Sequence, residues 1–402
     1  YFNVEGVIVQ SGAACGKICN GLQGVGVGAQ GRDGFVKGKV KHAFKRVGRG
    51  EGGDGVRRGN RLRRLVFGFG LRQGDVGLHV AKALWALATT NHQLLTTNNR
   101  KEQIKELGRA YVKGSEAYES GETAKKEIHE LNKKIFDRSD KEINKLYDAG
   151  RKVSLQHFEE IYKVLDTKFD YYFFEGTEGK EGVPIVEEYL KKGVFEKSDG
   201  AVVFKGEKHG LHTRVFINSQ GLPTYETKEL GLNKAKFEKE PDLDTSIIVT
   251  ANEQSDYFRV VLAAMKEVMP TVAEKTRHLA HGMLRFASGK MSSRKGNVIT
   301  GESLIEQVRE LVREKLKDRE LSQNEKDTIA EVVAVGAIKY SILRSANGSD
   351  IIFDIEKSVS FEGDSGPYLQ YSYVRAKSVL AKAEKEGIKS DFKEVSKSDL
   401  NK

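Results

Sequence analysis

The sequence predicts an α/β fold in which a parallel β-sheet precedes a mainly helical region that begins near residue 300. Residues 246–251 (SIIVTA) form a short apolar run, which is typical of a strand buried on both faces. Residues 257–269 then place apolar side chains at helical spacing, and a strand followed by a helix suits a parallel sheet. Residues 304–317 and 324–343 have the spacing of amphipathic helices. A chain of 402 residues has room for two to four domains.

The remaining elements follow from the same spacing rules. Apolar residues that recur every three or four positions indicate helices, and short apolar or alternating runs indicate strands. Pro184 fits the first turn of a helix, where its missing N–H leaves no bond unmade. The further expected helices cover 76–87, 101–150, 158–169, 185–192 and 369–385. The further expected strands cover 201–204 and 213–217.

Residues 1–70 differ in composition from the rest of the chain. They hold 18 of the 42 glycines, both cysteines and no proline. Such a stretch loses much backbone entropy on ordering and offers few large side chains to bury. We therefore expect this head, residues 1–70, to be disordered or to have no assigned fold. Translation of a wrong reading frame is the alternative explanation of this composition. Because the chain begins with Tyr1 rather than Met, we interpret it as a fragment or a misassembled gene product.

Composition excludes several classes of protein. The net charge is +10, but residues 1–70 contribute +9 of it, so the charge of the remaining chain is weak evidence for a nucleic-acid partner. No run of 18 apolar residues and no secretory signal occurs, so we expect no membrane association. Two cysteines cannot form a disulfide scaffold, which together with the missing signal favours a cytoplasmic protein.

The strongest local signal is the nonapeptide GKMSSRKGN at residues 289–297. Cations separated by small hydroxyl residues and bracketed by glycines suit a mobile loop that closes on phosphates. The cations would stabilise a developing pyrophosphate, and the serine hydroxyls would donate hydrogen bonds. The alternative is a solvated basic loop without a ligand. The central residues of this nonapeptide are Lys290, Met291, Ser292, Ser293 and Arg294.

This nonapeptide resembles the KMSKS loop of class I aminoacyl-tRNA synthetases, with Arg294 supplying the charge of the second lysine. Three more segments are similar to the arginyl members of that family. Residues 221–231 (GLPTYETKELG) resemble their amino-acid pocket, and residues 366–371 (GPYLQY) resemble the opening of their anticodon-binding domain. Residues 74–85 (GDVGLHVAKALW) resemble the segment after their first nucleotide-binding motif. The four matches occur in the order that the family has.

The resemblance implies an arginine–tRNA ligase, which attaches arginine to its tRNA through arginyl-adenylate. It implies ATP, with Mg²⁺ accompanying the ATP, and tRNA and arginine as partners, with no metal site in the protein. We also expect a monomer. The implied parts are a Rossmann-like parallel-sheet catalytic domain at 71–300 with a helical insertion at about 95–170, a helical stem-contact region at 301–365, and the start of a truncated α-helical anticodon-binding domain at 366–402.

The resemblance also assigns the arginine pocket to Tyr225 and Glu229. The two residues are spaced i, i+4, so on a helix they face one side. A guanidinium is planar and always charged, and it suits an aromatic ring to stack on and a carboxylate to pair with. Family members commonly have Asp at the position of Glu229, which keeps the charge on a shorter side chain. The alternative is a surface Glu beside a core Tyr.

Three more residues are expected near the same cleft. Gln254 follows the strand at 246–251, and ligands in open α/β sheets bind beyond the carboxyl ends of strands. An ordinary helix start, capped by Ser255 or Asn252, is the alternative there. By resemblance, Asp75 and His79 would line the same cleft.

One family feature is missing from the sequence. Class I synthetases carry a HIGH motif before the position of Gly74, and only His42 occurs in that part of the chain. The look-alike pairs at 209–212 and 278–281 lie in the wrong segments, so we expect structural or surface histidines there. The activity of this chain is therefore uncertain. A class I synthetase of cysteinyl or lysyl specificity, or a catalytically defective RNA-binding fragment, are the alternative functions.

Overall fold

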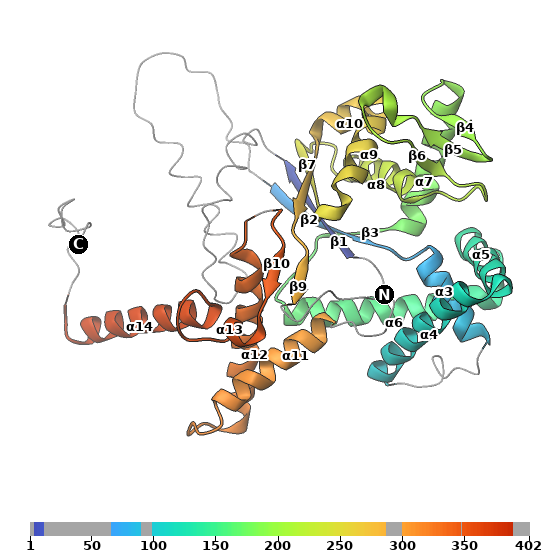
Figure 1. The fold of residues 1–402 in the computed structure, drawn as a ribbon. Coiled ribbons are helices and arrows are strands. Elements are labelled where there is room, and N and C mark those ends of the chain that lie inside the picture. The colour runs from blue at the N-terminus through green and yellow to red at the C-terminus, as the bar shows by residue number, and fades with distance from the viewer. Residues whose placement is uncertain (1–3, 12–65, 90–98, 287–299, 347, 389–402) are drawn as a thin grey trace, which may run out of the picture. The chain divides into compact units, whose positions relative to one another are not determined.

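A five-stranded β-sheet with the strand order β3-β2-β1-β7-β8 organises the first part of the chain (Figure 1). The computed structural model describes residues 4–11, 66–89, 99–286, 300–346 and 348–388. The strands of the sheet are β1 (Val4–Ser11), β2 (Val66–Gln73), β3 (Tyr171–Phe174), β7 (Thr245–Ala251) and β8 (Thr276–His281). β2 is parallel to β3 and β7 is parallel to β8, whereas β1 is antiparallel to both β2 and β7. The predicted parallel sheet is present, with one antiparallel strand at its centre.

β1 and the start of β2 lie in the head, where the sequence predicts no ordered element. Val4, Val7, Ile8 and Val9 are β-branched residues, which favour an extended backbone. β1 pairs with β2 on one side and β7 on the other, so both of its edges have backbone partners. The expected disorder of the head is therefore wrong at these two strands. Residues 12–65 lie outside the described residues, and for them it stays a prediction.

The described residues divide into two units. The first unit includes the sheet and the helices up to α10, together with residues 346–351. The second includes the four helices after residue 300.

Four helices of the first unit share one core. Its buried side chains include Leu84, Ile128 and Leu146. Asn99 and Asp140 cap two of the helices by accepting hydrogen bonds from backbone N–H groups of the first turn. The four helices are α3 (Leu78–Thr89), α4 (Arg100–Ser120), α5 (Glu122–Asp137) and α6 (Lys141–Val164) (Figure 1). The last three lie within the range of the predicted insertion. The helix expected at 158–169 is the end of α6, which stops at Val164.

A second core lies among α7, α8, α9 and a small antiparallel sheet of order β4-β5-β6. Phe195, Phe204 and Phe216 meet there at ring-centroid distances between 4.9 and 6.1 Å. The elements are α7 (Glu175–Lys191), β4 (Glu196–Ser198), β5 (Ala201–Phe204), η2 (Gly206–His209), β6 (Arg214–Ile217), α8 (Tyr225–Lys239), η3 (Asn252–Gln254), α9 (Ser255–Val268) and α10 (Pro270–Lys275).

The helix expected at 185–192 is present as the end of α7, but its predicted start is wrong. Pro184 does not open this helix, which begins at Glu175 and contains the proline in its interior. The cause is close packing against α8 at two glycines. A Cβ atom on Gly182 would lie 2.1 Å from Thr227 O, and one on Gly231 would lie 1.9 Å from Glu178 O. Tertiary packing therefore holds a glycine-rich segment in a helix that local propensity does not predict.

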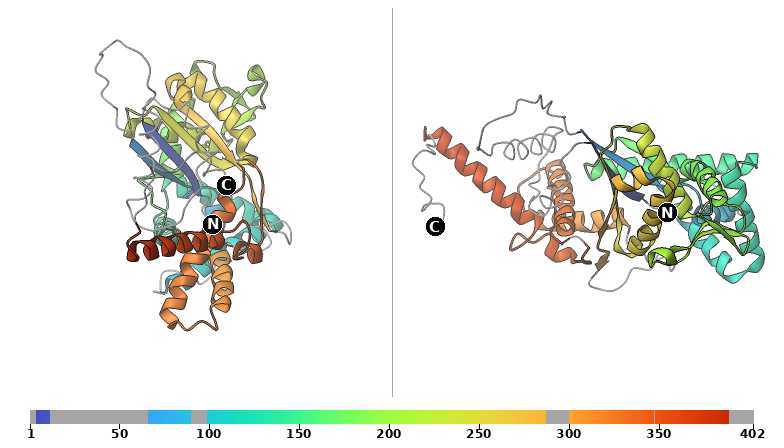
Figure 2. Two further views of the ribbon diagram at one scale, coloured as in Figure 1. Left: turned by 90° about the vertical axis from the view of Figure 1, so that its left-hand side faces the viewer. Right: turned by 90° about the horizontal axis from the view of Figure 1, so that it is seen from above.

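The second unit is helical, as the spacing predicts. Its helices are α11 (Gly301–Lys315), α12 (Gln323–Leu343), α13 (Ile355–Ser358) and α14 (Gly366–Lys385). Ser322 and Glu325 form a capping box at the start of α12. α14 starts against α12, where a Cβ on Gly366 would lie 2.7 Å from Gly336 O, and then continues as one long helix (Figure 2). The short strands β9 (Leu284–Phe286) and β10 (Ile351–Phe353) complete the described elements.

Candidate functional site

The carboxyl ends of β2, β3 and β7 lie at one edge of the sheet. Gln73 at the end of β2 pairs with Phe174 at the end of β3, and Leu71 and Val249 both pair with Gly6. Ligands of open α/β sheets bind beyond this kind of edge. The candidate site lies here, where the end of β2 meets the first turns of α7 and α8.

The start of α8 is held in place by β6. The Thr224 hydroxyl donates to Val215 O at 2.7 Å, and the Thr227 hydroxyl donates to Phe216 O at 2.6 Å. These bonds fix the first turn of α8, from which Tyr225 and Glu229 project. The Tyr225 ring also packs edge-on against Tyr257 of α9, with centroids 5.1 Å apart.

Tyr225 and Glu229 together hold a guanidinium group, and it belongs to Arg72 of β2. The Arg72 Cζ atom lies 3.9 Å from the centroid of the Tyr225 ring. Its Nη1 donates to Glu229 Oε1, and its Nη2 lies 3.1 Å from Oε1 of Glu175, the first residue of α7. Only 2% of Arg72 and 0% of Glu229 are exposed to solvent. The expected geometry of ring and carboxylate is therefore present, and the surface-Glu alternative is wrong.

Both carboxylates of this cluster have cationic partners. Lys228 Nζ donates to Glu175 Oε2 at 2.7 Å, and Arg72 contacts both Glu175 and Glu229. Asn233 Nδ2 also donates to Glu229 Oε2, at 3.3 Å. Burial raises the pKa of Glu175, but the charges of Arg72 and Lys228 outweigh that effect and hold the pKa below its usual value. Glu175 is therefore ionised at neutral pH.

His79 lies beside this cluster. Its Nε2 is 3.1 Å from Gly74 O, so this nitrogen carries the proton and donates it. Burial lowers the pKa of His79, and Glu175 is close enough to oppose that shift. The imidazole is thus neutral at physiological pH, with Nδ1 as its acceptor.

Asp75 has a different environment from the one expected of a cleft-lining residue. Its Oδ2 accepts hydrogen bonds from Tyr147 Oη and Arg151 Nε, both at 3.0 Å, and its Oδ1 accepts one from Gly176 N at 2.8 Å. Asp75 is buried and joins α6 to the first turn of α7. These hydrogen bonds hold the first turn of α7, which carries Glu175, and a role of Asp75 toward a ligand stays a prediction.

Gln254 is partly buried at the end of η3, directly before α9. No side chain caps α9, so neither Ser255 nor Asn252 has the capping role of the alternative interpretation. Asn252 instead lies 3.4 Å from Asp350 Oδ1. Tyr257 is the residue of this segment that contacts Tyr225. The role of Gln254 stays a prediction.

The five loop residues Lys290, Met291, Ser292, Ser293 and Arg294 lie outside the described residues, as does His42. The look-alike histidines make structural contacts. His278 stacks on Phe258 at 4.2 Å between centroids and lies 2.8 Å from Thr250 Oγ1. His209 stacks on Phe204 at 5.6 Å. These contacts agree with the structural roles expected for them.

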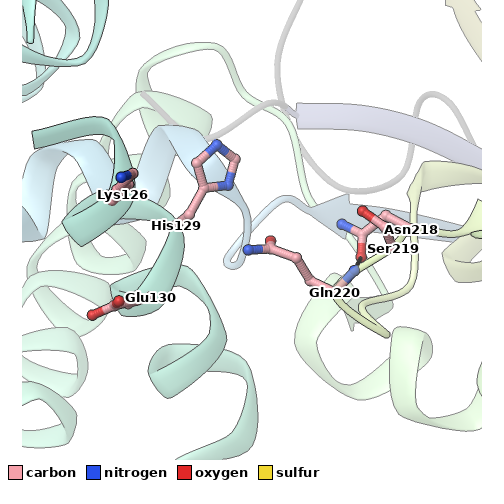
Figure 3. Close-up of a pocket in the computed structure, with 6 residues that line it drawn as sticks. All are labelled: Lys126, His129, Glu130, Asn218, Ser219 and Gln220. Carbon is pink, nitrogen blue, oxygen red and sulfur yellow. Dashed lines mark hydrogen bonds between the residues drawn. The ribbon is translucent and has the colours of Figure 1, made fainter. Parts of the chain in front are cut away.

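A hollow of about 420 Å³ lies elsewhere in the first unit (Figure 3). Residues of α5 line one side of it and the turn after β6 lines the other. It contains none of the predicted site residues. The lining residues are Lys126, His129, Glu130, Asn218, Ser219 and Gln220. In the described part of the chain, no group of three His, Cys, Asp or Glu side chains could hold a metal ion. No helix there has the length and apolar character needed to span a membrane.

Sequence reasoning missed Arg72, Glu175 and Lys228. Arg72 stands in a strand that begins in the glycine-rich head, and Glu175 opens a helix that was not predicted to start there. The one available signal for Arg72 was its position two residues before the segment 74–85, on the strand that leads into that segment.

Comparison with known proteins identifies the family. The family model described as "tRNA synthetases class I (R), catalytic domain" matches residues 82–355. An arginine–tRNA ligase of Clostridium kluyveri is 33% identical over 312 residues, which are 77% of this chain and 54% of that protein. An arginine–tRNA ligase of Borreliella burgdorferi is 31% identical over 316 residues, which are 77% of this chain and 54% of that protein. The chain thus spans about half the length of the curated relatives it matches.

Solved structures show the same fold. The arginyl-tRNA synthetase of Thermus thermophilus matches with a TM-score of 0.60 and 23% identity, over 77% of this chain and 57% of that one. The Plasmodium falciparum enzyme matches with a TM-score of 0.57 and 18% identity, over 77% and 50%. Fold, sequence and the guanidinium-holding pair agree, and the chain belongs to the class I arginyl-tRNA synthetase catalytic-domain family.

Proposed function

We propose that this chain carries the catalytic part of an arginine–tRNA ligase. The observation that carries the proposal is the guanidinium held between the Tyr225 ring and the Glu229 carboxylate, at the carboxyl edge of the sheet. A pocket that stacks and pairs a guanidinium selects arginine over other amino acids, since no other side chain is planar and permanently charged. Membership of the family supports the same assignment.

The proposed reaction has two steps. An oxygen of the arginine carboxylate attacks the α-phosphorus of ATP, the bond to the β-phosphate breaks, and arginyl-adenylate and pyrophosphate form. A ribose hydroxyl of the tRNA then takes the arginyl group and AMP leaves. Mg²⁺ bound to the ATP would neutralise part of the phosphate charge. The protein contributes position and electrostatic stabilisation.

In this proposal, Lys290 and Arg294 supply positive charge to the departing pyrophosphate, and Ser292 and Ser293 donate hydrogen bonds to it. Met291 follows Lys290 in the sequence. Gln254 would lie near the amino acid or the adenosine. A monomeric state, a cytoplasmic location and the roles of the region after residue 300 in tRNA binding stay predictions.

A second candidate is a fragment that binds tRNA without catalysis. The sequence favours it in one respect, because no HIGH motif precedes Gly74. A synthetase for another amino acid is less well supported, since the buried carboxylates of this site match a guanidinium.

The test is arginine-dependent exchange of pyrophosphate into ATP, measured with and without tRNA and with arginine raised until the rate saturates. Lys290→Ala should lower the exchange rate roughly 100-fold or more, the usual loss for one donor to a developing anion. Lys266→Ala, on the exposed side of α9, is the matched control and should leave the rate unchanged. Binding of tRNA without exchange at any arginine concentration would establish the second candidate instead, and exchange driven by a different amino acid would refute the specificity.

A further inference from the structure

The arginine pocket of the proposed function is filled by a residue of the chain itself. The guanidinium of Arg72 stacks on Tyr225 at 3.9 Å and bonds to Glu229, which are the contacts that the proposal gives to the substrate side chain. Arg72 comes from β2, and it is 157 residues away from Glu229 in the sequence. The pairing is therefore a product of the sheet and not of a local turn.

The space between the Tyr225 ring and Glu229 holds one guanidinium. Arg72 and Glu229 are almost completely buried, at 2% and 0% exposure, so a second planar cation cannot stack on the same face of Tyr225. Both carboxylates that contact Arg72 already have cationic partners, because Arg72 bonds to Glu229 and both Arg72 and Lys228 contact Glu175.

We propose that Arg72 is a tethered substrate mimic: its guanidinium occupies the arginine pocket, and a free alkylguanidinium such as arginine binds only when Arg72 is displaced or removed. This inference rests on the proposed function, since it takes Tyr225 and Glu229 to be the substrate pocket. A tethered group competes at an effective concentration in the millimolar range or above. If the pocket is open in about 1% of molecules, the apparent dissociation constant for arginine rises about 100-fold.

A purely structural role for Arg72 leads to a different expectation. Under either role, removal of Arg72 leaves Tyr225, Glu229 and Glu175 arranged around a guanidinium-shaped gap. If the pair only stabilises the fold, that gap takes up a bare guanidinium ion at least as well as arginine. A substrate pocket also binds the amino-acid part of arginine, so a gain for arginine above that for guanidinium ion separates the two roles.

The experiment is calorimetric titration of L-arginine into the full chain, into Arg72→Ala and into Arg72→Lys, with guanidinium ion, L-citrulline and L-lysine as ligand controls. Citrulline has the shape of arginine without its charge, and lysine has the charge without the planar fork. We expect Arg72→Ala to bind arginine at least tenfold more tightly than the unaltered chain, with a larger gain than guanidinium ion shows and no gain for citrulline or lysine. Adding Glu229→Gln to Arg72→Ala should abolish that gain.

Arg72→Lys keeps a cation opposite Glu229 and so preserves the fold if Arg72→Ala does not. It should bind arginine more tightly than the unaltered chain, because a lysine ammonium cannot stack on the ring as a guanidinium does. Folding of Arg72→Ala only when arginine is present would also support the proposal.

The results that overturn the proposal are distinct from those that overturn the proposed function. Equal arginine affinity in the unaltered chain and in the variants would refute occupation by Arg72 and leave the arginine site intact. Arginine binding that is absent from every folded variant, even those without Arg72, would refute the pocket itself, and the tethered mimic with it.

Discussion

The Glu229→Gln variant tests whether the buried ion pairs stabilise the fold, and it needs only a measurement of the free energy of unfolding. The unaltered cluster has two cations, Arg72 and Lys228, and two carboxylates, Glu175 and Glu229. The variant keeps the size of the side chain but leaves one buried positive charge in excess. Breaking a buried pair in this way costs about 3–5 kcal/mol. Because Arg72 retains its 3.1 Å contact with Glu175, we expect a value near the lower end of that range.

The assay is chemical denaturation followed by the fluorescence of Trp85, the single tryptophan of the chain. Trp85 lies in α3, in the same unit as the cluster, and its indole donates to Glu127 of α5 at 2.7 Å. Its signal therefore changes when the helices of this unit separate. A loss of about 3 kcal/mol is a large part of the stability of an ordinary domain and is easily measured.

A double-mutant cycle makes the test specific. Arg72→Met removes the excess cation, so the double variant with Glu229→Gln has one cation, Lys228, facing one carboxylate, Glu175. Its loss of stability should be smaller than the sum of the two single losses by about 1–3 kcal/mol. Strict additivity, or a Glu229→Gln variant within about 0.5 kcal/mol of the unaltered chain, the range of an ordinary surface change, would refute the reasoning.

Three further outcomes are expected. Gly231→Ala should destabilise the first unit by more than about 4 kcal/mol, because the new Cβ would lie 1.9 Å from a backbone oxygen. Gly108→Ala is the control: its Cβ would meet nothing within 4 Å, so the variant should be neutral or more stable by up to about 1 kcal/mol. Thermal unfolding of both variants checks this. Burial raises the pKa of Glu178 from 4.5 to about 7, so the folded chain holds a proton that the unfolded chain loses. The free energy of unfolding should therefore fall as the pH rises from about 4.5 to about 7. The Glu178→Gln variant should lose this pH dependence, and a variant that keeps it would contradict the prediction. Asp75→Asn should lower the free energy of unfolding by about 2 kcal/mol, because the buried Asp75 carboxylate accepts three hydrogen bonds. It should also speed hydrogen exchange at the Gly176 amide, which donates one of those bonds. Unchanged exchange at that amide would show that Asp75 does not position the start of α7.

Much of the fold follows from local patterns. The apolar run 246–251 lies within β7, the helical spacing at 304–317 and 324–343 appears as α11 and α12, and the parallel pairing of β7 with β8 agrees with the predicted sheet. These predictions succeed because strand and helix periodicity report which side of each element is buried. Where packing overrides local preference, prediction fails. The glycine-rich start of α7 is helical because α8 packs against it at Gly182 and Gly231.

For the site, the family resemblance in the sequence assigned the pair Tyr225 and Glu229, and their i, i+4 spacing predicted that they share one side of a helix, which is a local property. Only the tertiary structure decided what that pair holds. Arg72 reaches it through the pairing of β2 with β3, and Glu175 reaches it through the start of α7 directly after β3. Contacts between residues so distant in sequence depend on strand order and helix packing. The spacing of residues within one segment does not indicate strand order or helix packing. The contact between Arg72 and the pair Tyr225 and Glu229 could therefore be found only from the tertiary structure.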